Sequence, residues 1–264
     1  MIPKEFYGVD TRIWLKLTFA AAISTVLILP YALEFAGQGI PPLPQFLVIA
    51  LAVFIQNGLL FALVVYLGLR ISRKIGIEPT PVLSGKARLR DNLTISVISG
   101  LAAGVAIVVL DLVLNSIFVF TLKAGVAPGA GAPGAIEGFL ASFYGGISEE
   151  LLLRLFFVPF LCLVLIGILM LLGRAKTWEH TDTVVWVSVV IAAIVFGLGH
   201  LPATAAIMDI TPLVVFRAVL LNGVGGLVFG WLFYRKGLES AMISHFSADI
   251  VLHVLLPLLN VSLL

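Results

Sequence analysis

Residues 136–173, IEGFLASFYGGISEELLLRLFFVPFLCLVLIGILMLLG, form a long apolar run that is interrupted by Ser148-Glu149-Glu150 and Arg154. Spanning a hydrocarbon core of about 30 Å takes roughly 20 apolar residues in a helix, whose backbone groups satisfy one another. The run therefore predicts a transmembrane helix. An ionisable group at mid-bilayer costs about 2.5 kcal/mol or more, so such groups usually face the interior of a helix bundle and indicate a site.

The whole chain has the composition of a membrane protein. Of its 264 residues, 61% are hydrophobic and 11% are charged, whereas a soluble domain carries roughly 25% charged residues. We predict an all-α fold, a polytopic membrane helix bundle of seven or eight transmembrane helices with an intramembrane polar cavity. The number depends on Pro159, which could bend or break the long fourth helix. The predicted spans are 13–33, 43–69, 93–121, 136–173, 183–200, 212–234 and 238–258.

Basic residues between the spans predict the orientation of the chain and no nucleic-acid partner. With seven crossings all of them except Lys123 fall on one side, which the positive-inside rule places in the cytoplasm. The connections 34–42 and 122–135, the second rich in glycine and proline, then lie outside and hold only Lys123. The first apolar stretch shows no clear cleavage site, so we expect it to be retained, in a multi-pass protein of a prokaryotic cell membrane with a cytoplasmic amino terminus. The basic residues are Lys4, Arg12, Lys16, Arg70, Arg73, Lys74, Lys86, Arg88, Arg90, Arg174, Lys176, Arg235 and Lys236.

Helical spacing separates the two adjacent glutamates of the fourth span. At about 100° per residue, Glu150 lies about 40° from Arg154 around the helix, whereas Glu149 lies about 140° from it. Glu150 is then the natural partner of Arg154, which leaves Glu149 without a cation from its own helix. Such a carboxylate is a candidate general base. The alternative is a purely structural polar cluster that locks helices together, although such a cluster would hardly need the second acid.

Two later spans carry further ionisable side chains. Phe196-Gly-Leu-Gly-His200 ends the fifth stretch, and His245-Phe-Ser-Ala-Asp249 lies in the last one. Residues four apart share a helix face, so His245 and Asp249 are expected to point into one cavity. Sites in bundles are built from facing helices. We therefore expect these groups to meet those of the fourth span.

The motif order Glu-Glu-x-x-x-Arg, Phe-x-x-x-His and His-x-x-x-Asx, on separate spans, resembles the CPBP family of intramembrane proteases. That family includes the CAAX prenyl endopeptidases and bacteriocin-processing or immunity proteins. The resemblance covers roughly residues 136–258 and implies a motif-bearing catalytic core there, within a single integral membrane domain of residues 1–264. It implies that Glu149 and His200 activate a water, and that His245 and Asp249 stabilise the oxyanion. It implies supporting roles for Glu150, Arg154 and Phe196.

One position departs from the family pattern. The CAAX enzymes usually carry Asn where this sequence has Asp249, and an ionised carboxylate accepts hydrogen bonds but donates none. An oxyanion needs donors. Either Asp249 is protonated, or it orients His245 and leaves the donation to that imidazole. The departure bears on the CAAX substrate more than on hydrolysis.

We therefore predict an intramembrane glutamic endopeptidase that hydrolyses a peptide bond with a water held between Glu149 and His200, without a covalent acyl-enzyme. Ser148 and Ser244 each precede a motif residue, and helix neighbours diverge by about 100°, so neither is placed as nucleophile. The expected partners are the lipid bilayer and a substrate that is a lipidated, CAAX-type or hydrophobic peptide. No cofactor or metal is expected, and the oligomeric state stays open.

Two alternatives remain from the sequence. A zinc-dependent membrane protease, with metalloendopeptidase activity, could use two histidines and carboxylates as ligands, although no His-Glu-x-x-His is present. A non-enzymatic scaffold, an immunity protein or a proton-coupled carrier could use buried acids as a relay, with Asp111 and Asn115 as its path.

The remaining polar and small residues are expected to serve structure. Arg217, near the start of the sixth stretch, is expected to snorkel to the interface. His253 is expected to bond within the bundle. The glycines between Asn222 and Gly230 are expected to permit close helix packing.

Overall fold

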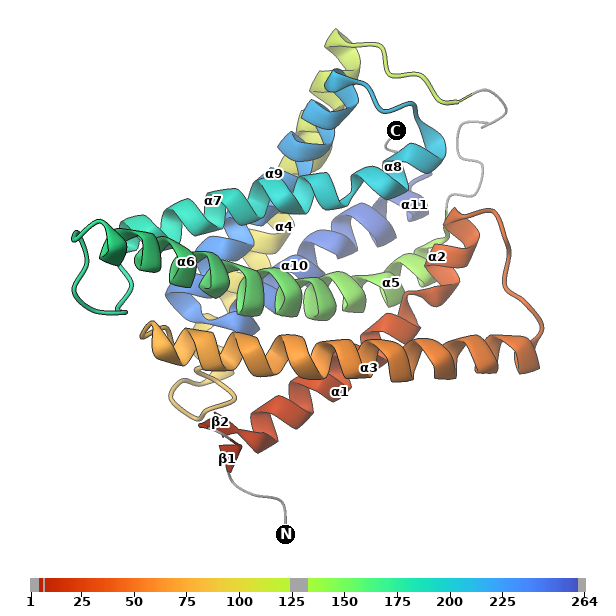
Figure 1. Ribbon diagram of the computed structural model, residues 1–264. Coiled ribbons are helices and arrows are strands. Elements are labelled where there is room, and N and C mark those ends of the chain that lie inside the picture. The colour runs from red at the N-terminus through yellow and green to blue at the C-terminus, as the bar shows by residue number, and fades with distance from the viewer. Residues whose placement is uncertain (1–4, 7, 124–132, 261–264) are drawn as a thin grey trace.

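The computed structural model describes residues 5–6, 8–123 and 133–260. Within these residues, seven helical segments are long and apolar enough to cross a membrane, and they lie against one another as a bundle (Figure 1). The predicted class is confirmed: the protein is an all-α, integral, multi-pass membrane protein. The expectations for Lys4 and for residues 124–132 of the glycine-rich connection lie outside the described residues.

Several spans contain more than one helical element, and an antiparallel pair of two-residue strands precedes the first span. The fourth and seventh spans include π-helical segments, labelled η. The elements are β1 (Glu5–Phe6), β2 (Val9–Asp10), α1 (Thr11–Leu27), α2 (Leu29–Phe35), α3 (Leu43–Lys74), α4 (Leu89–Ile117), α5 (Ala135–Phe143), η1 (Tyr144–Glu149), η2 (Leu151–Phe157), α6 (Val158–Leu171), α7 (Asp182–Gly199), α8 (Leu201–Ile207), α9 (Pro212–Lys236), α10 (Leu238–Asp249), η3 (Ile250–Leu255) and α11 (Leu256–Leu258).

The fourth span crosses once, as a continuous helical segment of 37 residues, so the count is seven and not eight. It does not break at Pro159, which stands in the first turn of α6, directly after the π-helical segment η2. Proline has no N–H, so Pro159 cannot donate the usual helical hydrogen bond to the carbonyl of Leu155, four residues earlier. Gly68 of α3 lies against this carbonyl, where an added Cβ would come within 2.7 Å.

The most polar span lies inside the bundle. The last span has a mean hydropathy of 1.5, the lowest of the seven. Its helix α10 packs against α4, α9, α5 and η1, which keeps its polar side chains away from lipid (Figure 1). Buried polar groups need protein partners, because the lipid core offers none. The buried polar residues of α10 are Glu239, Ser240, Ser244, His245, Ser247 and Asp249.

Small residues permit this close packing. A Cβ added to Gly100 of α4 would lie well under 3.0 Å from the backbone oxygen of Ser244 in α10. Added Cβ atoms on Gly226 and Gly230 would likewise crowd α7, at 2.7 Å from the Ala193 Cβ and 2.5 Å from Val189. The predicted packing role is confirmed for Gly226 and Gly230, and helices with small residues at such contacts can approach more closely. It is not confirmed for Gly223, whose added Cβ meets nothing within 4 Å, or for Gly225, whose added Cβ lies nearest to Phe229 of the same helix.

The expectation for Arg217 is wrong. Its guanidinium lies 2.6 Å from the Asp111 carboxylate, with the two side chains 10% and 0% exposed, so it does not reach the interface. Asn115 donates a hydrogen bond to the same carboxylate at 3.2 Å. Asp111 thus joins α4 to α9 through a buried ion pair, since a buried charge needs a partner. The proposed relay through Asp111 and Asn115 finds no support in this arrangement.

The connections 75–88 and 172–181 and the α9–α10 junction lie at the end of the bundle where α1 begins, toward the lower left of Figure 1. Most of the basic residues gather at this end, which we call the basic end. The opposite end carries α8, α11 and the 36–42 connection. Which end faces the cytoplasm stays a prediction from the basic residues.

We predict that Gly100→Ala lowers the melting temperature of the detergent-solubilised protein. The new methyl group must push α4 away from the Ser244 backbone, and overpacking of this kind costs about 1–3 kcal/mol. Gly223→Ala in α9 is the matched control, because nothing lies within 4 Å of its added Cβ. The control should melt at or above the wild-type temperature, since alanine favours a helix over glycine. Equal melting of the two variants would contradict this account of α4–α10 packing.

Candidate active site

The motif residues of three spans gather inside the bundle, close to π-helical turns. Glu149 ends η1, Glu150 follows it, and Arg154 lies in η2. His245 and Asp249 lie in α10, where Asp249 directly precedes η3. π-Helical turns are rare and often occur at functional sites.

Glu150 holds the cluster together. Its Oε1 accepts hydrogen bonds from the guanidinium of Arg154 and from Nδ1 of His245, both at 2.7 Å. The predicted Glu150–Arg154 pair is therefore present, and the bond to His245 ties it to the last span. Arg154 also donates to the carbonyl of Gly226 in α9 at 3.2 Å. Glu150 and Arg154 are both buried.

Aromatic rings enclose these charges. The Arg154 guanidinium lies 5.1 Å from the ring centroid of Phe196 and 5.4 Å from that of Phe229. The His245 imidazole stacks on Phe229 with the ring centroids 4.4 Å apart, and it meets Phe196 edge-on at 5.6 Å. The two rings exclude water from the ion pair and fix the plane of the imidazole. Phe229 was not singled out by the sequence, because it belongs to no motif.

His245 directs its second nitrogen toward two further carboxylates. A carboxylate only accepts, so Nδ1 carries the proton that it donates to Glu150. Nε2 lies 3.7 Å from Oε2 of Glu149 and 3.7 Å from Oδ1 of Asp249. At these distances the pairs are ion-pair contacts, because 3.7 Å is too long for a hydrogen bond. Nε2 can donate a proton outward only when the imidazole is positively charged.

The two adjacent glutamates differ in access. The Glu149 side chain is 23% exposed and that of Glu150 is 0% exposed. Within the described part of the chain, Glu149 has no hydrogen-bonding side-chain partner and contacts only the imidazole of His245 as an ion pair. Glu149 is therefore the carboxylate that an incoming molecule can reach.

Gly145 makes room for Asp249. An added Cβ on this residue of η1 would lie well under 3.0 Å from Oδ2 of Asp249, and 3.1 Å from Nε2 of His245. This glycine belongs to no motif and was not predicted from the sequence to be a site residue. Its place in an apolar helix, four residues before Glu149, was a usable signal, because a glycine inside a helix usually has a packing or functional reason.

His200 approaches the cluster through Phe196. It follows the last residue of α7, and its Nδ1 donates to the carbonyl of Phe196 at 2.8 Å. Its ring meets the Phe196 ring edge-on, with centroids 4.8 Å apart. Among the described residues, no hydrogen bond or ion pair joins His200 to Glu149. The structure thus brings His200 against the same ring as His245, and it leaves Nε2 of His200 without a bond to its own helix.

The first span, which carries no motif, also contacts the site. The hydroxyls of Ser24 in α1 and Ser148 lie 2.7 Å apart, next to Glu149 in the chain. The hydroxyl of Tyr31 in α2 lies 3.4 Å from Nδ1 of His253, and the two rings meet edge-on. His253 therefore bonds within the bundle, as expected from the sequence.

The described residues contain no group of three or more His, Cys, Asp or Glu side chains that could hold a metal ion. The zinc alternative and the associated metalloendopeptidase activity therefore gain no support from this geometry.

Fold and site together define a multi-pass membrane protein with a cluster of acids, arginine and imidazoles buried between its spans. Residues 131–251 match the family model described as Rce1-like, type II CAAX prenyl endopeptidase Rce1-like. The matched segment is less than half of the chain, and it contains all three motifs, so the resemblance predicted from them is confirmed. In general terms this match supports a CAAX-type intramembrane endopeptidase, and such a family implies a peptide substrate in a membrane setting. No curated protein and no solved structure matches the chain significantly.

We predict that Gly145→Ala lowers endopeptidase activity by roughly 100-fold or more. The methyl group would displace the Asp249 carboxylate and press on His245, and a misplacement of about 1 Å in a catalytic group can cost about that factor. Gly167→Ala is the matched control in the same span, because its added Cβ meets only Trp178, at ordinary contact distances of 3.7 and 3.8 Å. Cleavage of a prenylated peptide, followed by mass spectrometry, measures both variants. Equal activity in the two would show that Asp249 does not depend on the space at Gly145.

Proposed function

We propose that the protein is a glutamic endopeptidase in which Glu149 and His200 activate a water that attacks a peptide bond. The observation that carries this proposal is that two adjacent acids, Glu149 and Glu150, differ in burial and in hydrogen-bond partners. Glu150 is buried and bonded to Arg154 and His245, whereas Glu149 is accessible and has no hydrogen-bonding side-chain partner among the described residues. A general base must be free to take a proton at the reacting atom.

His200 suits the second position at the water. Donation from Nδ1 to the Phe196 carbonyl fixes the neutral tautomer that carries its lone pair on Nε2. A water between Glu149 and His200 would give one proton to Glu149 as its oxygen attacks the carbonyl carbon. The same proton then passes to the leaving amine nitrogen as the carbon–nitrogen bond breaks. The cycle releases a carboxylic acid and an amine and returns Glu149 as the carboxylate.

We assign oxyanion stabilisation to His245 and Asp249. The cluster holds three carboxylates, Glu149, Glu150 and Asp249, against the cation Arg154. Even with a charged imidazole the sum is three negative and two positive charges, or one excess negative charge. Burial disfavours such an excess, so we infer that Asp249 carries a proton. A protonated Asp249 can donate a hydrogen bond, as the Asn of the resembling CAAX enzymes does.

The proposed substrate is a lipidated, CAAX-type or hydrophobic peptide that reaches Glu149 from within the bilayer thickness. A buried site favours a substrate whose adjoining segment is itself apolar. We further propose that residues 1–264 act as one integral membrane domain, because Ser24 and Tyr31 of the first span contact the motif-bearing spans. The basic end is proposed to face the cytoplasm of a prokaryotic cell.

We predict that Glu149→Gln abolishes cleavage of a prenylated or hydrophobic peptide in detergent. The amide keeps the shape of the side chain but cannot take a proton from water, and general-base catalysis contributes about 10²–10⁴-fold. Glu179→Gln, at an exposed position in the 172–181 connection, is the matched control and should keep the wild-type rate. Both melting temperatures should stay near that of the wild type. A Glu149→Gln variant that cleaves at the wild-type rate would remove this proposal.

We predict that Asp249→Asn keeps activity within about tenfold of the wild type, whereas Asp249→Leu loses about 10²–10³-fold, the cost of removing an oxyanion donor. The pH profile tests the protonation state directly. If Asp249 donates as an acid, wild-type activity falls as rising pH removes its proton, and the Asn variant, which cannot ionise, loses that alkaline limb. An inactive Asn variant would instead assign Asp249 to the orientation of His245 as a carboxylate.

A further inference from the structure

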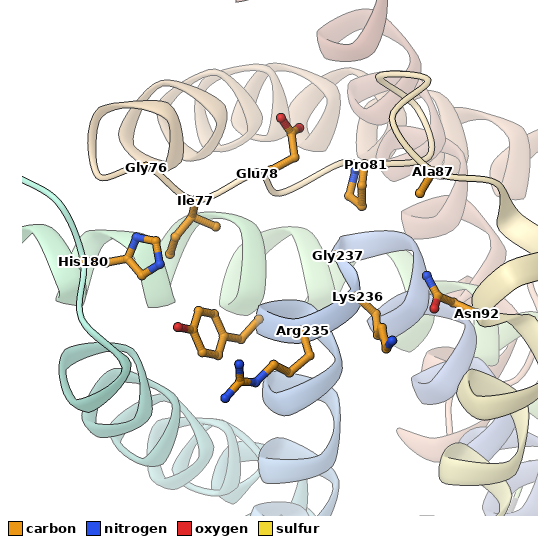
Figure 2. Close-up of a pocket in the computed structure, with 11 residues that line it drawn as sticks. Gly76, Ile77, Glu78, Pro81, Ala87, Asn92, His180, Arg235, Lys236 and Gly237 are labelled. Atoms are coloured by element: carbon orange, nitrogen blue, oxygen red, sulfur yellow. The ribbon is translucent and has the colours of Figure 1, made fainter.

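A hollow of about 400 Å³ lies at the basic end of the bundle, apart from the motif residues. Figure 2 shows the 76–87 connection on one side of the hollow and the end of α9 on the other. Its polar lining comes from separate parts of the chain. These residues are Glu78, Asn92, His180, Tyr234, Arg235 and Lys236.

The ends of several spans surround the hollow, and they indicate its depth in a membrane. It is lined by residues just after α3, in the first turn of α4, just before α7, at the end of α9 and at Gly237 before α10. Five spans thus begin or end around it. The ends of spans that cross a core of about 30 Å lie in the headgroup region, so the hollow opens among phosphate groups.

The charges that face the hollow favour an anion. Two cations, Arg235 and Lys236, oppose one carboxylate, that of Glu78. The Glu78 carboxylate pairs with Lys86, and in Figure 2 it points away from Arg235 and Lys236. Arg235 lies over the ring of Tyr234, with its Cζ 4.9 Å from the ring centroid, and makes an exposed ion pair with Asp182 at 3.4 Å. Exposed pairs of this kind contribute little.

Lys236 is a cation that is available to a ligand. In the described part of the chain its ammonium makes no hydrogen bond and no ion pair, and the side-chain amide of Asn92, which also lines the hollow, is likewise without a hydrogen-bond partner. An ammonium and an amide NH₂ together offer donors to a phosphate oxygen. His180 and Tyr234, whose rings meet edge-on at 5.9 Å, close the other end of the hollow.

We propose that this hollow binds a phosphate group, with Lys236, Arg235 and Asn92 as its donors. Basic pockets between membrane helices on the cytoplasmic side bind the headgroups of anionic lipids. The phosphate of an anionic phospholipid and a soluble phosphate ester share this chemistry, and the depth of the hollow favours the lipid.

The hollow adjoins Gly237, at the junction between α9 and α10. Gly237, with a φ of 95°, separates α9 from α10, and its added Cβ would collide with Pro81 of the facing connection. His245 follows Gly237 by eight residues, which is about 12 Å along a helix. A phosphate bound beside Gly237 therefore steadies the start of the helix that carries His245 and Asp249.

The test measures lipid retention in the full chain and does not depend on its catalytic activity. The wild type and two variants are purified from nanodiscs of mixed phosphatidylglycerol and phosphatidylcholine, and retained lipid is measured by native mass spectrometry. The wild type should retain phosphatidylglycerol preferentially. Lys236→Gln should lower that retention about fivefold, the effect of one basic residue near a membrane surface. Lys176→Gln is the matched control, because Lys176 is an exposed basic residue at the same end but outside the hollow. This variant should retain as much phosphatidylglycerol as the wild type.

A second arm separates the two sources of phosphate. Glycerol 3-phosphate is added to the delipidated wild type and to Lys236→Gln, and the shift in melting temperature is recorded. A shift in the wild type alone, without lipid retention, supports the phosphate site and assigns it to a soluble ester. Equal lipid retention by Lys236→Gln and Lys176→Gln, together with no selective shift, overturns the proposal, because only diffuse attraction by the basic end would remain.

Discussion

The buried carboxylate of Glu150 accepts hydrogen bonds from Arg154 and from His245, and these two bonds determine how the neighbouring helices must lie. Glu150 can stay in the membrane interior only because Arg154 and His245 both donate to it, and Arg154 in turn reaches the carbonyl of Gly226. A buried charge that loses its partner is costly. The fourth span, α9 and α10 must therefore lie at fixed distances from one another. The contacts that hold the helices together are thus the same contacts that form the site.

This requirement explains where small residues and π-helical turns occur. A polar helix such as α10 must be surrounded by protein, and its neighbours approach it only where side chains are absent, as at Gly100 and Gly145. The π-helical turn η1 places Gly145 against Asp249 while Glu149 keeps its access. Apolar rings then fill the space around Arg154 and exclude water. Packing and electrostatics thus select the same residues.

The sequence could predict what depends on one helix at a time. Hydropathy located the seven spans, and the spacing of four residues paired Glu150 with Arg154. Contacts between helices were not accessible in the same way. The Arg217–Asp111 pair joins residues 106 positions apart, and nothing in either span indicates the other. Phe229 and Gly145 act on the site through space alone, so a single sequence could at most mark the glycine as unusual.

The excess of acids in the cluster has a chemical consequence. Glu150 is neutralised by its two donors, so the remaining negative charge is shared between Glu149 and Asp249, which both face Nε2 of His245 at 3.7 Å. Two carboxylates that share one imidazole in an apolar setting compete for the same proton. Whichever acid holds a proton becomes a donor, and the other becomes a base. The accessibility of Glu149 and the confinement of Asp249 by Gly145 therefore agree with the proposed division of roles, in which Glu149 is the base that faces the substrate and Asp249 is the acid behind it.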